Sequence, residues 1–150
     1  MMVQELIKDL FHTLTLSELQ LMNKNYYDGN MSYNSLLYID LIYYHEGEYT
    51  ASKIADELCV SKPAVIMKIN ELIEKGYLYK QQDTKDKRNY YLYTTDKIKQ
   101  EYDRYRSLDN QVAAYLENKY DDKQLAQFKM IFDDMCNTYI NICRGKNNGS

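Results

Sequence analysis

The sequence has no tryptophan, no long apolar run and no low-complexity segment. A membrane-spanning helix requires roughly 18 uninterrupted apolar residues, and no stretch approaches that length. The first residues, MMVQELIKDLF, carry Glu5, Lys8 and Asp9 inside their apolar repeat, which is unlike a signal peptide. A chain of 150 residues has the size of one domain with helical extensions. We therefore expect a soluble, cytoplasmic bacterial protein without a membrane partner.

Histidine is scarce, and the residue patterns of catalytic or metal sites are missing. The only histidines are His12 and His45. His45 stands just before Gly47 at the predicted end of a helix, where the helix dipole favours a side chain that can carry positive charge. No serine or cysteine lies in a triad pattern, and no glycine-rich phosphate-binding loop occurs. The sequence predicts neither an enzyme nor a metal or cofactor site.

The three cysteines, Cys59, Cys136 and Cys143, lack the spacing of metal ligands. Cys136 and Cys143 would lie roughly 10 Å apart along one helix, beyond the ~7 Å limit for a disulfide. We interpret all three as buried free thiols in a reducing compartment. A thiol redox switch is the alternative. Cys59 is then the candidate, because it lies just before a predicted helix N-terminus that favours thiolate.

Charge is distributed unevenly along the chain. The formal net charge of −3 argues against a protein that coats nucleic acid over its whole surface. Residues 61–88 nevertheless contain seven lysines and arginines against four aspartates and glutamates, so this segment carries +3 and the remainder −6. Because binding depends on where charge is located, this segment is a candidate nucleic-acid surface.

Hydrophobic periodicity predicts helices on both sides of one short region with an alternating pattern. Helical spacing begins at Val3, continues through LSELQLM, and is interrupted by NYYDGNMS. Ser32 is expected to cap the helix YNSLLYIDLIYYHE, which ends at Gly47, and Thr50 is expected to cap ASKIADEL. The inward face of ASKIADEL is predicted to consist of Ile54, Ala55 and Leu58.

The stretch SKPAVIMKINELIEKGYL, residues 61–78, has the features of a helix that reads DNA. Ser61 is a suitable N-cap, Pro63 lies in the first turn, and Gly76 can end the helix. A core stripe is formed by Val65, Ile69, Leu72 and Ile73. Beyond Gly76, YLYKQQ and NYYLYTT alternate as strands do, and the basic stretch DTKDKR joins them as a hairpin tip. Two further helices are predicted, KIKQEYDRYRSLDNQVAAYLENKY and the amphipathic DKQLAQFKMIFDDMCNTYINIC.

Two short helices joined by a tight turn and followed by a charged hairpin are typical of a winged helix-turn-helix. The segment TASKIADELCVSKPAVIMKINELIEKGYLYKQQDTKDKRNYYLYTT resembles the core of the multiple antibiotic resistance regulator (MarR) family. The matching residues are Thr50, Ile54, Ala55, Ser61, Pro63, Val65, Leu72, Gly76, Asp86, Arg88, Leu92 and Thr94. The flanking helices also fit that family, so the resemblance covers nearly the whole chain.

The resemblance implies a mainly α fold with a small β-hairpin wing. Residues 32–95 would form the winged helix-turn-helix DNA-binding lobe, 1–30 and 96–145 the dimerisation helices, and 145–150 a frayed tail. It further implies a homodimeric transcriptional regulator, usually a repressor, that a small molecule or an oxidant releases from DNA. A symmetric dimer requires a palindromic operator in double-stranded DNA, with half-sites about 34–36 Å apart.

The N-terminal end of the recognition helix is expected in the major groove, and Arg88 of the wing in an adjacent A·T-rich minor groove. Asp86 would orient Arg88, and lysines would contact phosphates. The candidate DNA-binding residues are Ser61, Lys62, Pro63, Ala64, Met67, Lys68, Lys85, Asp86, Lys87 and Arg88.

Two positions depart from the family pattern, which commonly has a hydroxyl residue at position 66 and a basic residue at 67. We interpret Ile66 as an extended edge of the core, because Ile69 and Ile73 follow it at helical spacing. Met67 should be exposed on the face of Pro63, where it can contact thymine methyl groups. The absence of an arginine–guanine pair there removes about 1–3 kcal/mol of discrimination, so an A·T-leaning operator of modest selectivity is predicted.

The 17 tyrosines raise the question of an effector. Related proteins bind aromatic or phenolic ligands beside the DNA-binding lobe, so Tyr33, Tyr38 and Tyr102 are candidate effector residues. Core packing is the favoured interpretation, because a chain without tryptophan must fill its core with other side chains. Two alternatives stay open. One is a redox-responsive regulator, although the peroxide-sensing members carry their cysteine in the first helix. The other is a protein-interaction module without DNA binding, which has no use for a basic wing with Arg88.

Overall fold

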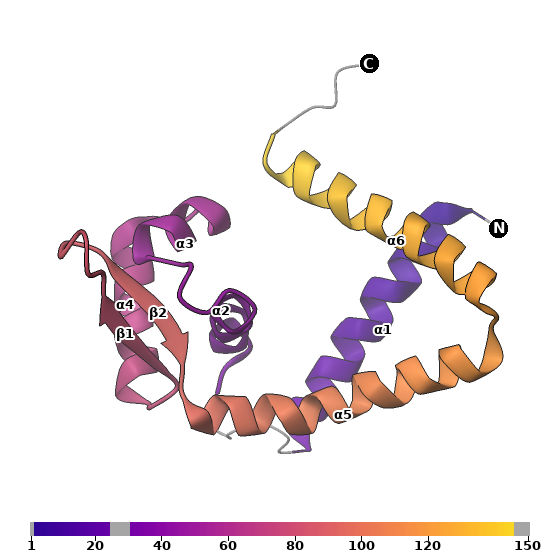
Figure 1. Ribbon diagram of the computed structural model, residues 1–150, viewed down its shortest axis with the longest axis horizontal. Helices are drawn as coiled ribbons and strands as arrows, with labels where there is room; N and C mark the ends of the chain where they lie inside the picture. The colour runs from indigo at the N-terminus through magenta and orange to yellow at the C-terminus, as the bar shows by residue number, and fades with distance from the viewer. Residues whose placement is uncertain (1, 25–30, 146–150) are drawn as a thin grey trace. The chain divides into compact units, whose positions relative to one another are not determined.

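A computed structural model describes residues 2–24 and 31–145 of the chain (Figure 1). The elements are α1 (Val3–Asn23), α2 (Tyr33–Tyr43), α3 (Ala51–Leu58), α4 (Lys62–Glu74), β1 (Leu78–Gln82), β2 (Tyr90–Thr94), α5 (Asp96–Lys119) and α6 (Asp122–Cys143). The predicted mainly α fold with one antiparallel hairpin is confirmed. Most of the predicted break, at 25–30, and of the frayed tail, at 146–150, lies outside the described residues. Within the described part, no helix is both long and apolar enough to cross a membrane.

Side-chain caps fix where α2 and the two helices of the helix-turn-helix, α3 and α4, begin. Ser32, Thr50 and Ser61 each accept a hydrogen bond from the backbone N–H three residues later, as predicted. Each such cap contributes about 1 kcal/mol to stability. The predicted helix, which runs to Glu46 and stops at Gly47, is three residues too long, because α2 ends at Tyr43 and a turn follows.

The hydrophobic core lies between α2, α3, α4, the hairpin and the first turns of α5. Its fully buried aliphatic side chains are Ile39, Ile42, Ile54, Val65, Leu72, Leu78 and Ile98. Tyr77 and Tyr102 are buried with them, and Leu21 and Met22 of α1 pack against this cluster. The core therefore extends past residue 95 into α5. The chain forms two compact units, residues 1–105 and 106–150.

Two predictions of inward-facing residues are wrong. Leu58 is 39% exposed, because α3 ends there and only Ile54 and Ala55 of its predicted inner face are buried. Ile66 is 41% exposed and does not extend the core stripe of α4. It stands four residues from both Lys62 and Asn70, and side chains at that spacing form one row along a helix. That row points beside the core and not into it.

The hairpin that forms the wing is fixed at its base by the turn after α2. Its register pairs Leu78 with Thr94 and Lys80 with Leu92. The Glu46 carboxylate accepts hydrogen bonds from the backbone N–H of Thr94, at 3.0 Å, and from the Thr94 hydroxyl. Gly47 donates to the carbonyl of Leu92 at 3.0 Å. These bonds attach β2 to the turn that follows α2, so the wing is held at its base as well as by the core.

Gly47 is required by this attachment for two reasons. Its φ of +73° is in the left-handed region that glycine adopts most readily. A Cβ atom at this position would lie only 2.6 Å from the hydroxyl oxygen of Tyr93. The close approach of the Tyr93 ring to the backbone therefore depends on glycine.

Candidate nucleic-acid interface

The N-terminal end of α4 is presented to solvent. Ser61, Lys62, Pro63, Ala64 and Met67 are all exposed. Met67 is 72% exposed, as predicted from its position on the helix. These side chains are free of the core because the buried stripe, from Val65 to Leu72, occupies the opposite side of α4.

Lys68 differs from the other predicted contacts on α4. Its side chain is only 16% exposed, and its Nζ lies 3.1 Å from Oε2 of Glu71. Lys75 also donates to Glu71, at 2.8 Å. The hydrogen bonds from Lys75 and Lys68 lower the pKa of the Glu71 carboxyl. Lys68 is therefore engaged in an ion-pair cluster on α4 and does not project as Met67 does.

The tip of the wing presents Arg88 in a defined orientation. Arg88 Nε lies 3.1 Å from Oδ1 of Asp86, and Nη2 lies 3.2 Å from Oδ2, so the pair is bidentate. The backbone N–H of Arg88 also donates to Asp86, so Asp86 contacts both the side chain and the backbone of the arginine, as expected of a residue that orients it. Hydrogen bonds from the side chain and then the backbone of Arg88 lower the pKa of Asp86. The Arg88 side chain is 90% exposed.

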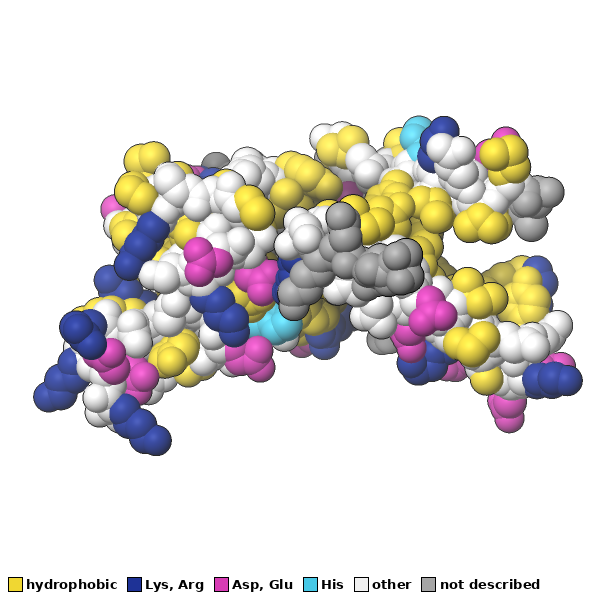
Figure 2. Space-filling view, turned by 90° about the horizontal axis from the view of Figure 1, so that it is seen from above, with side chains coloured by type: hydrophobic (Ala, Val, Ile, Leu, Met, Phe, Trp, Pro, Cys, Tyr) yellow, Lys and Arg dark blue, Asp and Glu magenta, His cyan; other side chains and the backbone are white. Residues whose placement is uncertain are grey.

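Backbone bonds fix the loop around these side chains. Asp83 N–H donates to the carbonyl of Asn89, and Asn89 N–H donates to that of Asp86, both at 2.9 Å. Lys85 and Lys87 are exposed on this loop. Figure 2 shows lysine and arginine side chains projecting at the left, around the wing. The tip is thus a fixed and locally basic turn.

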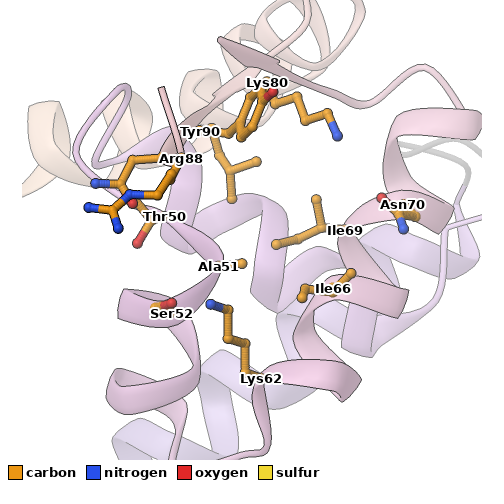
Figure 3. A pocket seen from close by; sticks show the side chains of 12 residues that line it. Thr50, Ala51, Ser52, Lys62, Ile66, Ile69, Asn70, Lys80, Arg88 and Tyr90 are labelled. Carbon is orange, nitrogen blue, oxygen red and sulfur yellow. The ribbon is translucent and has the colours of Figure 1, made fainter. Parts of the chain in front are cut away.

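A depression of about 280 Å³ lies where α3, α4 and the wing meet (Figure 3). Its lining residues are Thr50, Ala51, Ser52, Lys62, Ile66, Ile69, Asn70, Lys80, Arg88, Asn89, Tyr90 and Leu92. The structure thus brings together Lys62 and Arg88, which were predicted from the recognition helix and the wing separately. The depression gives both elements one shared surface.

The sequence-based prediction missed Lys80 and the role of Ile66 at this depression. The sequence did indicate Lys80. Side chains alternate between the two faces of β1, so Lys80 lies on the same face as Leu78, and its partner on β2 is Leu92. A signal for Ile66 was its spacing of four residues from Lys62 and Asn70. The contributions of Thr50 and Ser52 had no such signal, since they depend on how α3 packs beside the wing.

The predicted effector residues lie in different environments. Tyr38 and Tyr102 are buried in the core, which confirms the packing interpretation for both. The Tyr102 ring stacks on Tyr43 at 4.3 Å between centroids, and its hydroxyl donates to Asp40 Oδ1 at 3.2 Å. Burial raises the pKa of Asp40, and this hydrogen bond opposes the shift. Tyr33 is exposed at the start of α2.

The cysteines are free, as predicted, but the expectation that they are buried is wrong. All three are exposed. Cys59 caps the C-terminus of α3 with a left-handed φ of 54°, and this turn points its side chain away from the core. Cys136 and Cys143 lie on α6, which has no buried residue.

His45 lies in the turn after α2, beside Glu48 and Tyr49. Its Nδ1 is 3.2 Å from Oε2 of Glu48, and its ring packs edge-on against Tyr49. In residues 2–24 and 31–145 no three side chains of the types that bind metals are grouped as a metal site.

Comparisons with known proteins agree with this architecture. The model of the MarR family matches residues 31–90, from the start of α2 to the start of β2. The HTH-type transcriptional regulator SarT of Staphylococcus aureus (strain MSSA476) is 32% identical over 84 residues, which are 55% of this chain and 71% of SarT.

Solved structures of two bacterial proteins show the same fold over almost the whole chain. Streptococcus pneumoniae FabT, in complex with DNA, aligns with a TM-score of 0.72 and 18% identity over 93% of this chain and 96% of FabT. A mutant of MepR, from a multidrug resistant S. aureus clinical isolate, has a TM-score of 0.72 and 16% identity. That alignment covers 93% of this chain and 98% of MepR. The winged helix-turn-helix, the matched segment and the likeness to SarT together show that the chain belongs to the MarR family of transcriptional regulators, which are not enzymes.

Proposed function

We propose that this protein is a homodimeric repressor that binds a palindromic DNA operator through α4 and the wing. The observation that carries this proposal is the shared depression that Lys62 of α4 and Arg88 of the wing both border. Two basic elements that face one surface can bind one DNA duplex together. That FabT was solved in complex with DNA supports the same use of this fold.

In this arrangement the N-terminal end of α4 enters the major groove. Ser61, Pro63, Ala64 and Met67 are then nearest the base edges, and Lys62 contacts phosphate. Arg88 enters the adjacent minor groove, with Asp86 holding the guanidinium in place, while Lys85 and Lys87 contact phosphates. We leave Lys68 out of the proposed contacts, because its bond to Glu71 would have to break first.

The exposed Met67 is one reason to propose an operator rich in A·T base pairs. An exposed thioether on the reading face can contact the methyl group of thymine but cannot form the bidentate bond that arginine makes to guanine. The wing arginine favours narrow minor grooves, which occur over A·T-rich sequence. Both contacts favour an A·T-leaning operator, with much of the affinity coming from phosphates.

The exposed apolar faces of α1 and α6 support a homodimer. Neither helix has a buried residue, and both carry large exposed apolar side chains, among them Leu6, Phe11, Phe128 and Ile131. An apolar surface of this extent on one chain is normally covered by a partner. We propose residues 1–30 and 96–145 as the dimerisation region and 32–95 as the DNA-binding lobe, except that the first turns of α5, with Ile98 and Tyr102, belong to the core of the lobe.

A small-molecule effector completes the proposal. Such a ligand would release DNA by changing the distance between the two lobes of the dimer. Of the three candidate tyrosines, Tyr33 is exposed, whereas Tyr38 and Tyr102 are core residues that a ligand would reach only by opening the lobe. Tyr33 is therefore the position at which we would first test an aromatic or phenolic ligand.

The experiment that tests this function is selection of bound fragments from random duplex DNA, followed by a salt titration of the selected sequence. We expect a palindrome with half-sites about one helical turn apart and a steep fall of affinity with salt. A protein-interaction module would enrich no palindrome and show no salt dependence, and that result would overturn the proposal.

A further inference from the structure

We infer that the depression between α3, α4 and the wing seats the sugar–phosphate backbone of one DNA strand, with Lys80 as a phosphate contact. This inference rests on the proposed DNA-binding function and assigns a role to residues outside the predicted contact set. It concerns Lys80 on β1 and Ile66 on α4 in particular. Figure 3 shows these side chains around the depression together with Lys62 and Arg88.

The charge of the depression is complementary to a phosphate chain. Lys62, Lys80 and Arg88 come from three different elements and border it, and none of the described residues that line it is acidic. Asp86 offsets part of the charge of Arg88, whereas Lys62 and Lys80 add positive charge along the rim. Phosphates of one strand can therefore meet Lys62 and Lys80 on the rim, while Arg88 stands at the edge that faces the adjacent minor groove.

The floor of the depression is apolar. It includes Ile66, Ile69 and Leu92, of which only Ile66 is substantially exposed. Deoxyribose is the least polar part of the DNA backbone, so a sugar placed over Ile66 buries apolar surface on both sides. This contact gives a reason for an isoleucine that neither fills the core nor offers a hydrogen bond to a base.

Lys80 is held at the rim by its neighbour across the hairpin. Its Nζ lies 5.1 Å from the centre of the Tyr90 ring, at the distance of a cation–π contact. The Tyr90 hydroxyl in turn lies 3.3 Å from Nε2 of Gln82. Tyr90 and Lys80 both line the depression, so this contact keeps the ammonium group beside the proposed phosphate path.

Lys80→Gln, compared with Lys97→Gln, tests the inference. Lys97 is a matched control, because it is exposed in the same compact unit and its Nζ lies 4.9 Å from the centre of the Tyr77 ring, but it does not line the depression. Each change removes one positive charge. The measurement is the slope of log affinity against log salt concentration, on the selected operator and on a random duplex of equal length.

Lys80→Gln should make this slope less steep by about one unit per subunit, and should weaken binding to both duplexes by the same factor. Lys97→Gln should leave the slope unchanged. Equal slopes for the two variants would overturn the inference while leaving DNA binding intact. A wild-type protein without any salt-dependent binding would instead overturn the proposed function itself.

Ile66→Ser tests the floor of the depression separately. Because Ile66 is exposed, this change should leave the fold intact, which circular dichroism would verify. We expect binding to operator and random duplex to weaken several-fold and by the same factor, since every sequence has the same sugar. A change in the ratio of the two affinities would assign Ile66 to base reading and overturn the sugar contact.

Discussion

The winged lobe and the helical arms use their apolar side chains in opposite ways. We define the lobe as residues 31–105 and the arms as α1 and residues 106–143. In the lobe Ile39, Ile54 and Leu72 are fully buried within one chain. The arms have no buried residue among those described, and Phe128 of α6 is 55% exposed. The lobe therefore has a buried core, against which Leu21 and Met22 of α1 also pack, whereas most of the apolar side chains of the arms are exposed.

This difference suits a division of roles, in which the lobe would bind DNA and the arms would bind a second chain. The proposed DNA contacts, from Ser61 to Arg88, belong to the part with the buried core, where the cap of α4 and the Asp86–Arg88 hydrogen bonds hold them in place. The arms carry the apolar surface that a second copy would cover. A dimer built in this way would be able to move its two lobes relative to each other without refolding them, as the proposed release by an effector requires.

The largest effect is expected from a change in the core of the lobe. Leu72→Ala removes a fully buried side chain and should lower the free energy of unfolding by about 2–5 kcal/mol. Leu37→Ala, at an exposed leucine of α2, is the control and should change it by less than about 0.5 kcal/mol. Chemical denaturation of both variants measures the difference, and equal losses would contradict the assignment of the core.

A change in the arms should act on association and not on the fold of the lobe. Phe128→Ser should raise the dissociation constant of the dimer by at least about tenfold, because large aromatic side chains dominate such interfaces. Gln127→Ser, at an exposed polar neighbour on α6, should leave it unchanged. Sedimentation velocity over a range of concentrations distinguishes the two variants. An unchanged dissociation constant for Phe128→Ser would show that this part of α6 is not in the dimer interface.

A smaller effect is expected from the base of the wing. Glu46 binds Thr94 and lies 4.0 Å from Nζ of Lys99, so we expect it to position the wing, and it is not among the proposed DNA contacts. Arg88→Ala should weaken operator binding by about 1–3 kcal/mol. Glu46→Ala should weaken it less, and Glu46→Gln, which keeps an acceptor for Thr94, should recover most of that loss.

A double-mutant cycle measured by fluorescence anisotropy identifies the route of the Glu46 effect. If Glu46 acts by orienting the wing, Glu46→Ala should cause no further loss of operator-binding free energy in a protein that already carries Arg88→Ala. Fully additive losses would show that Glu46 supports the fold in general and not the wing arginine.

The smallest effect is expected at the reading face. Met67→Ala should lower operator affinity by under about 1 kcal/mol and should relax the preference for thymine at one base pair of each half-site. Met67→Leu keeps an apolar contact and should preserve that preference. Repeating the selection from random DNA with both variants measures it, and an unchanged operator in the alanine variant would exclude Met67 from base reading.

Periodicity and capping residues predicted most of the fold, because these signals are local. Ser32, Thr50 and Ser61 cap their helices as expected, and the alternating tyrosines of residues 77–95 form the hairpin. Ile66 could not be predicted in the same way. Helical spacing suggested the core, but its actual surroundings depend on where the wing packs.

The exposure of side chains in the arms also could not be predicted from the sequence of one chain. Cys136 and Cys143 were expected to be buried, since cysteine usually is. They are exposed because α6 buries nothing within its own chain. The pattern of an amphipathic helix predicts that its apolar face packs against another surface. It does not predict whether that surface belongs to the same chain or to another one.

The most direct test of this account is the DNA that wild type and Phe128→Ser select from one random duplex pool, with each variant's lobe shown to be folded. The account predicts that wild type enriches a palindrome with half-sites about 10 base pairs apart, centre to centre. It predicts that Phe128→Ser enriches at most a single half-site. Enrichment of the same palindrome by both proteins, or of no palindrome by wild type, would contradict it.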